Sequence, residues 1–125
     1  ATAREDWSCR LVATNFWMYA GDTKIIEIAV TDQDGDAVNL TDATIRWRAT
    51  RSLGKTASIT KQTGGSGIVI TSATGGIFQV TLTPANTESL EGKFYHEAEV
   101  TFTDATVSTV LTGTMTIRRV LIVAT

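Results

Sequence analysis

Apolar and polar residues alternate through most of the chain, in short runs separated by turn residues. In residues 23–32, Ile26, Ile28 and Val30 take every second position, and Glu27 lies between the first two. Because successive side chains of a strand point to opposite faces, a period of two is typical of a strand with one buried face. The pattern predicts that the isoleucine and valine set faces a core.

Four more segments alternate in the same way, and each predicts one inward set. The sets are Ile45, Trp47 and Ala49; Phe78, Val80 and Leu82; Phe94, His96, Ala98, Val100 and Phe102; and Leu111, Gly113, Met115 and Ile117. These segments are rich in β-branched residues, which fit a pleated surface.

Turn signals separate the segments, among them Asp34-Gly35 and Gly75-Gly76. The predicted strands lie at 15–20, 23–32, 43–50, 56–62, 67–71, 76–83, 93–103 and 106–118, with a short piece at 120–123. Only residues 84–91 favour a helical turn, capped by Asn86 or Thr87. Seven or more short strands at this spacing predict one all-β domain, an antiparallel β-sandwich without a linker.

Two details favour an immunoglobulin-like sandwich of about seven to nine strands. Trp47 lies inward on the third main strand, where such folds place a large buried aromatic residue. Residues 92–96 resemble the corner before the sixth strand, with Phe94 in the place of the usual tyrosine.

In that topology the third and sixth strands are neighbours in one sheet. Two outward arginines of the third strand would then face two outward glutamates of the sixth. The expected partners are Arg46 and Arg48 with Glu97 and Glu99. Each such pair is worth about 0.2–1 kcal/mol.

Composition narrows the function classes. The 125 residues are enough for one domain that folds unaided. A net charge of -2, from 11 basic and 13 acidic residues, is a poor basis for binding nucleic acid. No apolar run reaches the roughly 20 residues that span a bilayer, and the polar start is no secretory signal. The single cysteine, Cys9, excludes an internal disulfide and fits folding in a reducing cytoplasm. We expect neither nucleic acid nor membrane as a partner.

The order of these signals is similar to that of a known family. Gly21-Asp22 opens a strand that closes at residues 32–35, and residues 38–45 (VNLTDATI) lead into the next. Further on come IVI at 68–70, GIFQVTL at 76–82, GKFYHE at 92–97 and GTMTI at 113–117. Over about residues 20–118 this order resembles the immunoglobulin-like domains of tailed-phage virion proteins, especially the N-terminal domain of the baseplate upper protein family.

Members of that family are structural parts of tails, baseplates, necks and head surfaces. The resemblance implies a non-enzymatic component of a tailed-phage particle, without cofactors, that docks on capsid or tail subunits as a homo-oligomer or in many symmetric copies. Its location would be the virion, after assembly in the host cytoplasm. The baseplate members continue into a long second domain, whereas this chain stops soon after its last strand. That departure favours a head decoration protein, a spike or fibre base, or a small tail or baseplate adaptor.

Asp32, Asp34 and Asp36 alternate around Gly35, which echoes the oxygen-ligand spacing of calcium loops. An EF-hand loop needs glycine at its sixth position and glutamate at its twelfth, and counting from Asp32 both positions are alanine. A hairpin turn with Asp-Gly at its tip explains the same residues without a metal. The hairpin is the preferred interpretation, and calcium stays the alternative.

His96 is the one histidine and falls in an inward set, so we expect a partly buried ring with one hydrogen-bonded nitrogen. Cys9 has no recognisable nucleophile motif and is interpreted as an ordinary thiol. No paired-carboxylate pattern accompanies them. An enzyme therefore has little support.

The first sixth of the chain holds four of its nine aromatic residues. Because aromatic side chains are enriched in interface hot spots, we interpret residues 1–14 as an arm and residues 15–125 as the sandwich. The expected partner-binding residues are Trp7, Cys9, Leu11, Val12, Phe16 and Trp17. For the last two, the favoured alternative is a first strand in which Phe16, Met18 and Ala20 cover one sheet.

A second function class is a module that binds carbohydrate or a host surface, because exposed aromatic rings stack on sugars. Outward Trp17 and Tyr95 are its candidate residues. Residues 120–125 form a second apolar end, which would extend an edge strand or add to the sheet of a neighbouring molecule.

Overall fold

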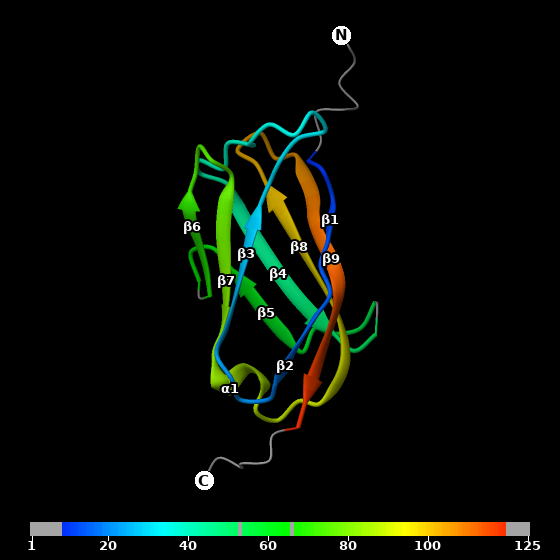
Figure 1. The fold of residues 1–125 in the computed structure, drawn as a ribbon. Coiled ribbons are helices and arrows are strands. Elements are labelled where there is room, and N and C mark those ends of the chain that lie inside the picture. The colour runs from blue at the N-terminus through cyan, green and yellow to red at the C-terminus, as the bar shows by residue number, and fades with distance from the viewer. Residues whose placement is uncertain (1–8, 53, 66, 120–125) are drawn as a thin grey trace.

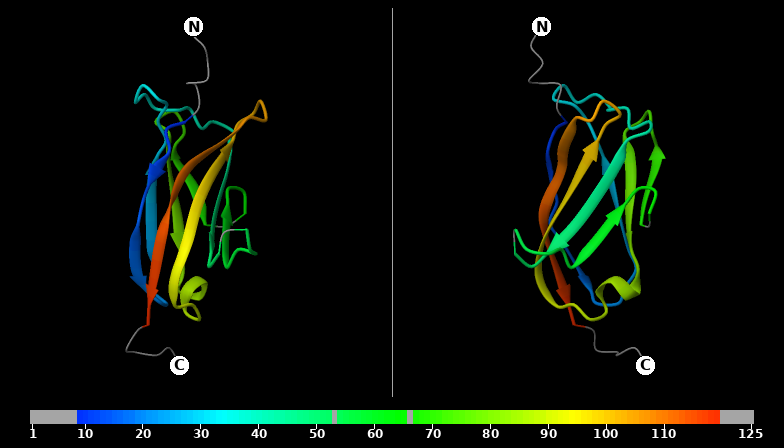
Figure 2. Two further views of the ribbon diagram at one scale, coloured as in Figure 1. Left: turned by 90° about the vertical axis from the view of Figure 1, so that its right-hand side faces the viewer. Right: turned by 180° about the vertical axis from the view of Figure 1, so that it is seen from behind.

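Two β-sheets face each other across one hydrophobic core (Figures 1 and 2). The computed structural model describes residues 9–52, 54–65 and 67–119. Its strands are β1 (Val12–Ala13), β2 (Phe16–Tyr19), β3 (Lys24–Ala29), β4 (Thr44–Thr50), β5 (Ile59–Gln62), β6 (Ile68–Ser72), β7 (Ile77–Leu82), β8 (Gly92–Thr101) and β9 (Val107–Arg118). One short helix, α1 (Pro84–Thr87), connects β7 to β8.

The strand order confirms the predicted immunoglobulin-like sandwich. The larger sheet runs β9-β8-β4-β5, with β1 and β2 along the outer side of β9, and the smaller runs β3-β7-β6. In the lettering of immunoglobulin folds these are the G-F-C-C′ and B-E-D sheets. All pairs are antiparallel except those of β1 and β2, which run parallel to β9.

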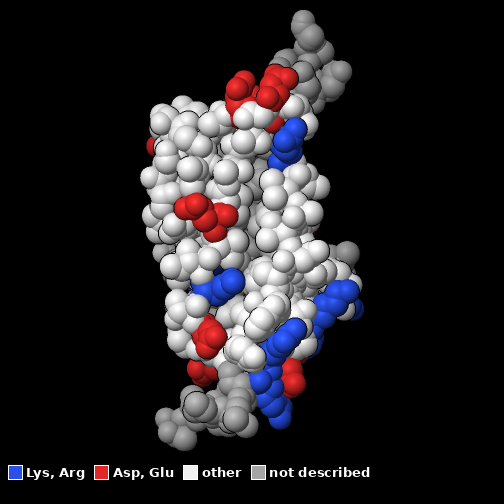
Figure 3. Space-filling model, viewed as in Figure 1, with Lys and Arg blue, Asp and Glu red and all other residues white. Residues whose placement is uncertain are grey.

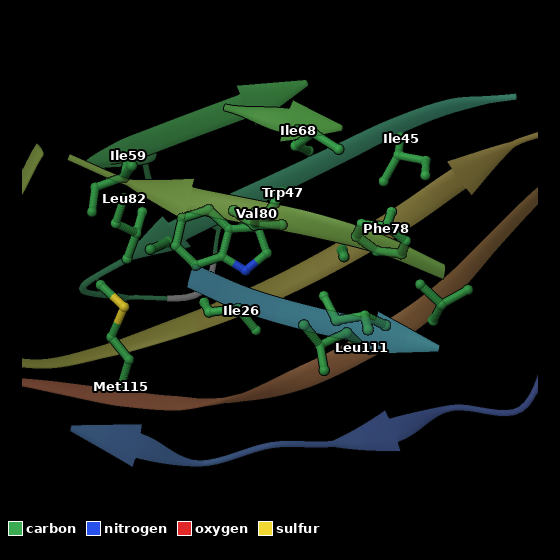
Figure 4. Packing of buried hydrophobic residues seen from close by; sticks show 14 of the residues in the cluster. Ile26, Ile45, Trp47, Ile59, Ile68, Phe78, Val80, Leu82, Leu111 and Met115 are labelled. Carbon is green, nitrogen blue, oxygen red and sulfur yellow. The ribbon is translucent and has the colours of Figure 1, made fainter. Parts of the chain in front are cut away.

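The predicted inward sets form the core. Trp47 is fully buried and lies between the two sheets, surrounded by aliphatic side chains from both (Figure 4). Phe94 is fully buried at the corner where a tyrosine is usual. Of the predicted set on β8, only Phe102, beyond the end of the strand, is partly exposed.

The cross-strand charge pairs are also present in the predicted register. Arg46 lies opposite Glu99, and Arg48 lies opposite Glu97. The guanidinium of Arg46 is 3.8 Å from the Glu99 carboxylate, and both side chains are partly exposed to solvent. An exposed pair of this kind contributes about 0.2–1 kcal/mol.

The predicted helix cap is wrong. The helix is capped by Thr83, because the next residue is Pro84, whose missing N–H and fixed φ suit the first helical position. Asn86 lies inside the helix, and its side-chain oxygen accepts a hydrogen bond from the Thr83 N–H at 2.7 Å. At four residues, α1 is too short to cross a bilayer, and the described residues hold no longer helix.

The N-terminal part of the chain joins the two sheets. Cys9 bridges to Asp32 on the side of the smaller sheet, and the Arg10 N–H bonds the Thr31 carbonyl at 2.7 Å. β1 and β2 then pair with β9 in the larger sheet. Residues 9–14 are thus part of the sandwich and not of an arm, because their backbone groups are paired. Residues 1–8 and the predicted strand at 120–123 lie outside the described residues.

Candidate binding surfaces

The segment that carries β1 and β2 is held by a buried polar chain. The carbonyl oxygen of Thr14, between the two strands, lies against Gly113, where an added Cβ would overlap with it. His96 Nε2 is 2.9 Å from the same oxygen. Trp47 Nε1 donates a hydrogen bond to His96 Nδ1 at 3.2 Å. The N–H therefore resides on Nε2, and the imidazole is neutral.

This arrangement corrects the prediction for His96. Both ring nitrogens are hydrogen-bonded, and the residue is buried beneath Phe16, whose ring makes an edge contact at 5.3 Å. Burial lowers the pKa of His96, and the hydrogen bond to Thr14 opposes that shift to a smaller extent. The ring positions a strand and has no face open for catalysis.

The lowered pKa of His96 predicts a loss of stability in mild acid. The unfolded chain binds a proton near pH 6.5, whereas the native ring resists it, so the free energy of unfolding falls as pH drops below about 6.5. Above that pH the contribution of His96 to the free energy of unfolding is complete. Urea titrations at pH 7.5 and 5.5 measure it, and His96→Phe is the control because the chain has no other histidine. If the free energy of unfolding changes equally between pH 7.5 and 5.5 in both proteins, the pKa of His96 is not lowered in the folded state.

An aromatic pair stands at the edge of the larger sheet. Trp17 and Tyr19 point outward from β2, are 48% and 42% exposed, and contact each other edge-on at 5.3 Å. Arg118 of β9 stacks on Trp17, with Cζ 4.2 Å from the ring centroid. We call these three residues the aromatic edge. Beside it lies a shallow hollow of about 610 Å³ that extends along β2 to Lys24. Aromatic and arginine side chains held in one geometry are typical anchors of protein interfaces.

Some of the predicted partner-binding residues are buried in the structure, and others are exposed. Trp7 lies outside the described residues. Cys9 is buried, and Val12 and Phe16 pack against the core, so these three are not available to a partner in the way predicted. The favoured alternative holds for this strand, because Phe16 and Met18 turn inward. Leu11 and Trp17 are exposed as a partner contact requires.

Tyr95 lies in a separate groove on the outer face of the larger sheet. The groove measures about 900 Å³, and its floor includes Arg48, Glu97 and Thr114. Gly54–Ala57, in the loop after β4, contribute one wall. Lys93 Nζ is 5.2 Å from the Tyr95 ring centroid. Trp17, the other candidate for sugar stacking, is not among the groove's residues.

The aspartate cluster forms the tip of a hairpin, as preferred from the sequence. The three carboxylates lie within 4.8 Å of one another. One Asp32 oxygen accepts hydrogen bonds from the N–H groups of Asp34 and Asp36, at 2.9 and 3.0 Å. Gly35 has φ +88°, the left-handed conformation that such a turn requires. The backbone thus explains the spacing of these residues.

Cys9 behaves as the ordinary thiol expected. Burial raises its pKa, and the nearby Asp32 carboxylate adds to the increase, although a hydrogen bond with Ser108 opposes it. The thiol therefore stays protonated at neutral pH and is a weak nucleophile.

Sequence reasoning left out Tyr19 and Arg118 as site residues. The alternation could have predicted Tyr19 as a surface residue, because it lies two positions after Trp17 and so points to the same outward face. Arg118 was not, because only the parallel register with β9 brings it beside Trp17. The groove around Tyr95 likewise depends on which strands are neighbours.

Comparisons with known proteins find matches among solved structures alone. No protein-family model and no curated protein matches the chain. Among solved structures, the Ig1 domain of mouse SynCAM 2 matches with 15% sequence identity and a TM-score of 0.42, over 91% of this chain and 98% of that one. Extracellular domains 3–5 of Drosophila OTK match with 15% identity and a TM-score of 0.34, over 92% of this chain and 36% of that one.

Proposed function

We propose that this protein is a non-enzymatic structural component of a tailed-phage particle, which docks on capsid or tail subunits through the aromatic edge. The order of strand and turn motifs supports the phage class. The observation that carries the docking surface is the exposed pair of Trp17 and Tyr19 on an outer strand. His96 and Cys9 are both buried, so neither offers a base or nucleophile at the surface.

The aromatic edge suits an assembly role because its geometry is already fixed. Arg118 and Tyr19 contact the Trp17 ring, so little side-chain freedom remains to be lost on binding. Many weak contacts of this kind, repeated around a symmetric particle, give strong overall attachment.

Co-sedimentation with particles of the encoding phage tests this proposal. We expect Trp17→Ala and Tyr19→Ala each to weaken binding about tenfold or more, because both remove a central aromatic anchor. Ile25→Ala is the matched control, since Ile25 is 55% exposed but lies on the smaller sheet. Removal of residues 1–8 tests Trp7 separately and leaves every described residue in the protein. Unchanged binding by both aromatic variants would refute the docking surface, and no binding by the intact protein would refute the function.

The groove around Tyr95 favours a second candidate function, recognition of carbohydrate. Its lining combines one aromatic ring with an arginine, a glutamate and several threonines, so it offers both donors and acceptors to sugar hydroxyls. The volume of about 900 Å³ falls in the range of ligand sites.

An array of immobilised oligosaccharides tests the groove. We expect Tyr95→Ala to abolish any binding and Tyr19→Ala, an exposed tyrosine outside the groove, to leave it unchanged. If no oligosaccharide is retained by the intact protein, this second function is wrong.

A further inference from the structure

We propose that the open side of β2 accepts residues 120–125 of a second copy of this chain as an added strand, so that copies join head to tail. This inference rests on the proposed function only in placing docking at β2, and it names the neighbour that docks there. The side chains of the aromatic edge point out of the sheet, whereas an added strand would bond the backbone from the side. The two contacts are therefore compatible.

The free backbone groups follow from the pairing with β9. The N–H groups of Thr14 and Ala20 bond the carbonyls of Thr112 and Arg118, so the even-numbered residues turn their backbone toward β9. Because backbone direction alternates along a strand, Trp17 and Tyr19 turn theirs to the open side. The Tyr19 carbonyl is taken by the Asp22 N–H at 3.2 Å. Among the described residues, the Trp17 N–H and C=O and the Tyr19 N–H have no hydrogen-bond partner, so they are left for a partner strand.

Three other sheet edges, those at β5, β6 and β3, carry features that discourage strand addition, and β2 does not. β5 places the charged side chain of Lys61 inward, β6 has a bulge between Ile70 and Ser72, and β3 carries Lys24 and Glu27. Inward charge, bulges and charged edge residues all disfavour pairing with another chain. β2 reads Phe-Trp-Met-Tyr, with no charge and no proline. Unless another segment covers it, such an edge strand can pair with a strand of another chain.

The chain contains a segment that fits this template. Residues 120–123 read Val-Leu-Ile-Val, four apolar residues of which three are β-branched, and β2 is four residues long. Neither β2 nor residues 120–123 contain a charged side chain, and the charged residues that line the hollow beside β2 are Asp22 and Lys24. A hollow of about 610 Å³ runs beside β2 and leaves room along the strand.

Geometry favours a neighbour's segment over the chain's own. β2 and β9 are parallel, and Tyr19 at the end of β2 lies beside Arg118 at the end of β9 (Figure 1). The described part of the chain thus ends close to the end of β2, and a segment continuing from there would have to reverse direction to pair with β2 of the same molecule. A segment donated by another copy needs no such reversal. The contact joins two different surfaces, which leads to rings or filaments rather than a closed two-fold pair.

A complementation experiment tests the proposal by sedimentation of the purified protein. Trp17→Pro removes the N–H on the open side without touching a bond to β9, and a second variant lacks residues 120–125. We expect the full chain to self-associate and each variant alone to be monomeric. Their equimolar mixture should form a 1:1 complex and nothing larger, because one supplies the edge and the other the strand. Ile25→Ala is the control, because Ile25 is exposed on the smaller sheet and the variant should still self-associate.

Three results would overturn the inference: a monomeric full chain, self-association by either variant alone, or a mixture that stays monomeric. If Trp17→Pro fails to fold, Tyr19→Lys replaces it as an edge blocked by charge. Because the measurement contains no particles, it is independent of the proposed function. Self-association without particle binding would refute that function alone, and particle binding by a strictly monomeric full chain would refute this inference alone.

Discussion

Replacing Gly113 with alanine is expected to displace the segment of β1 and β2 from β9 and to lower the free energy of unfolding by about 3 kcal/mol. The new methyl group would overlap with the Thr14 carbonyl, which is backbone and cannot rotate away. Moving that carbonyl also breaks its bond with His96 and leaves a buried N–H unpaired. Gly113 is thus required for the space it leaves.

Amide hydrogen exchange of residues 12–19 and urea unfolding together measure this effect. Thr116→Ala is the matched control, because Thr116 lies on the same strand but is exposed. If the amides of β2 stay protected in Gly113→Ala and stability is unchanged, the close approach of Thr14 is not a determinant of the fold.

Trp47→Ala is expected to cost about 3–5 kcal/mol, the usual range for deleting a large buried aromatic side chain. The indole fills the centre of the core between the sheets, and its N–H is the donor to His96 Nδ1. Trp47→Phe separates the two contributions, since it keeps a ring but leaves that nitrogen without a donor, at a cost of about 1–3 kcal/mol.

Chemical denaturation followed by circular dichroism checks both variants. Trp17→Ala removes a half-exposed tryptophan together with its contacts to Tyr19 and Arg118, and should cost no more than about 1.5 kcal/mol. A similar loss for Trp17→Ala and Trp47→Ala would show that the core assignment is mistaken.

Alternation predicted which side chains are buried because burial on one face is a local property of a strand. It placed Ile26, Trp47, Phe78 and Met115 in the core correctly. The charge pair of Arg46 and Glu99 required one further assumption, the neighbour relation of the third and sixth strands, which the fold class supplied.

The segment before β3 was harder to predict because its structure depends on distant residues. The local sequence favours an arm for Leu11 and Val12 and a strand for Phe16. Their position is set by β9 and by the space over Gly113, about which the local sequence contains no information. The aromatic edge and the groove around Tyr95 are hard to predict for the same reason.

Acidic side chains gather at the end of the molecule that carries the Asp32 hairpin, and a further acidic group lies on the smaller sheet (Figure 3). Ile25 and Val69 are exposed on that face. They serve as useful comparison sites for the aromatic edge, because they are similarly exposed but belong to the other sheet.

The parallel pairing of β2 with β9 has a consequence for synthesis of the chain. Asn15 and Thr114, which are hydrogen-bonded across this pair, are 99 positions apart. β2 therefore leaves the ribosome well before β9 and must wait for that strand before the two can pair, and contacts of such long range form slowly. Until then Phe16 to Tyr19 remain uncovered on the nascent chain. Neighbouring ribosomes on one messenger would hold several such strands close together, so we expect exchange of β2 between copies to compete with correct folding at that stage.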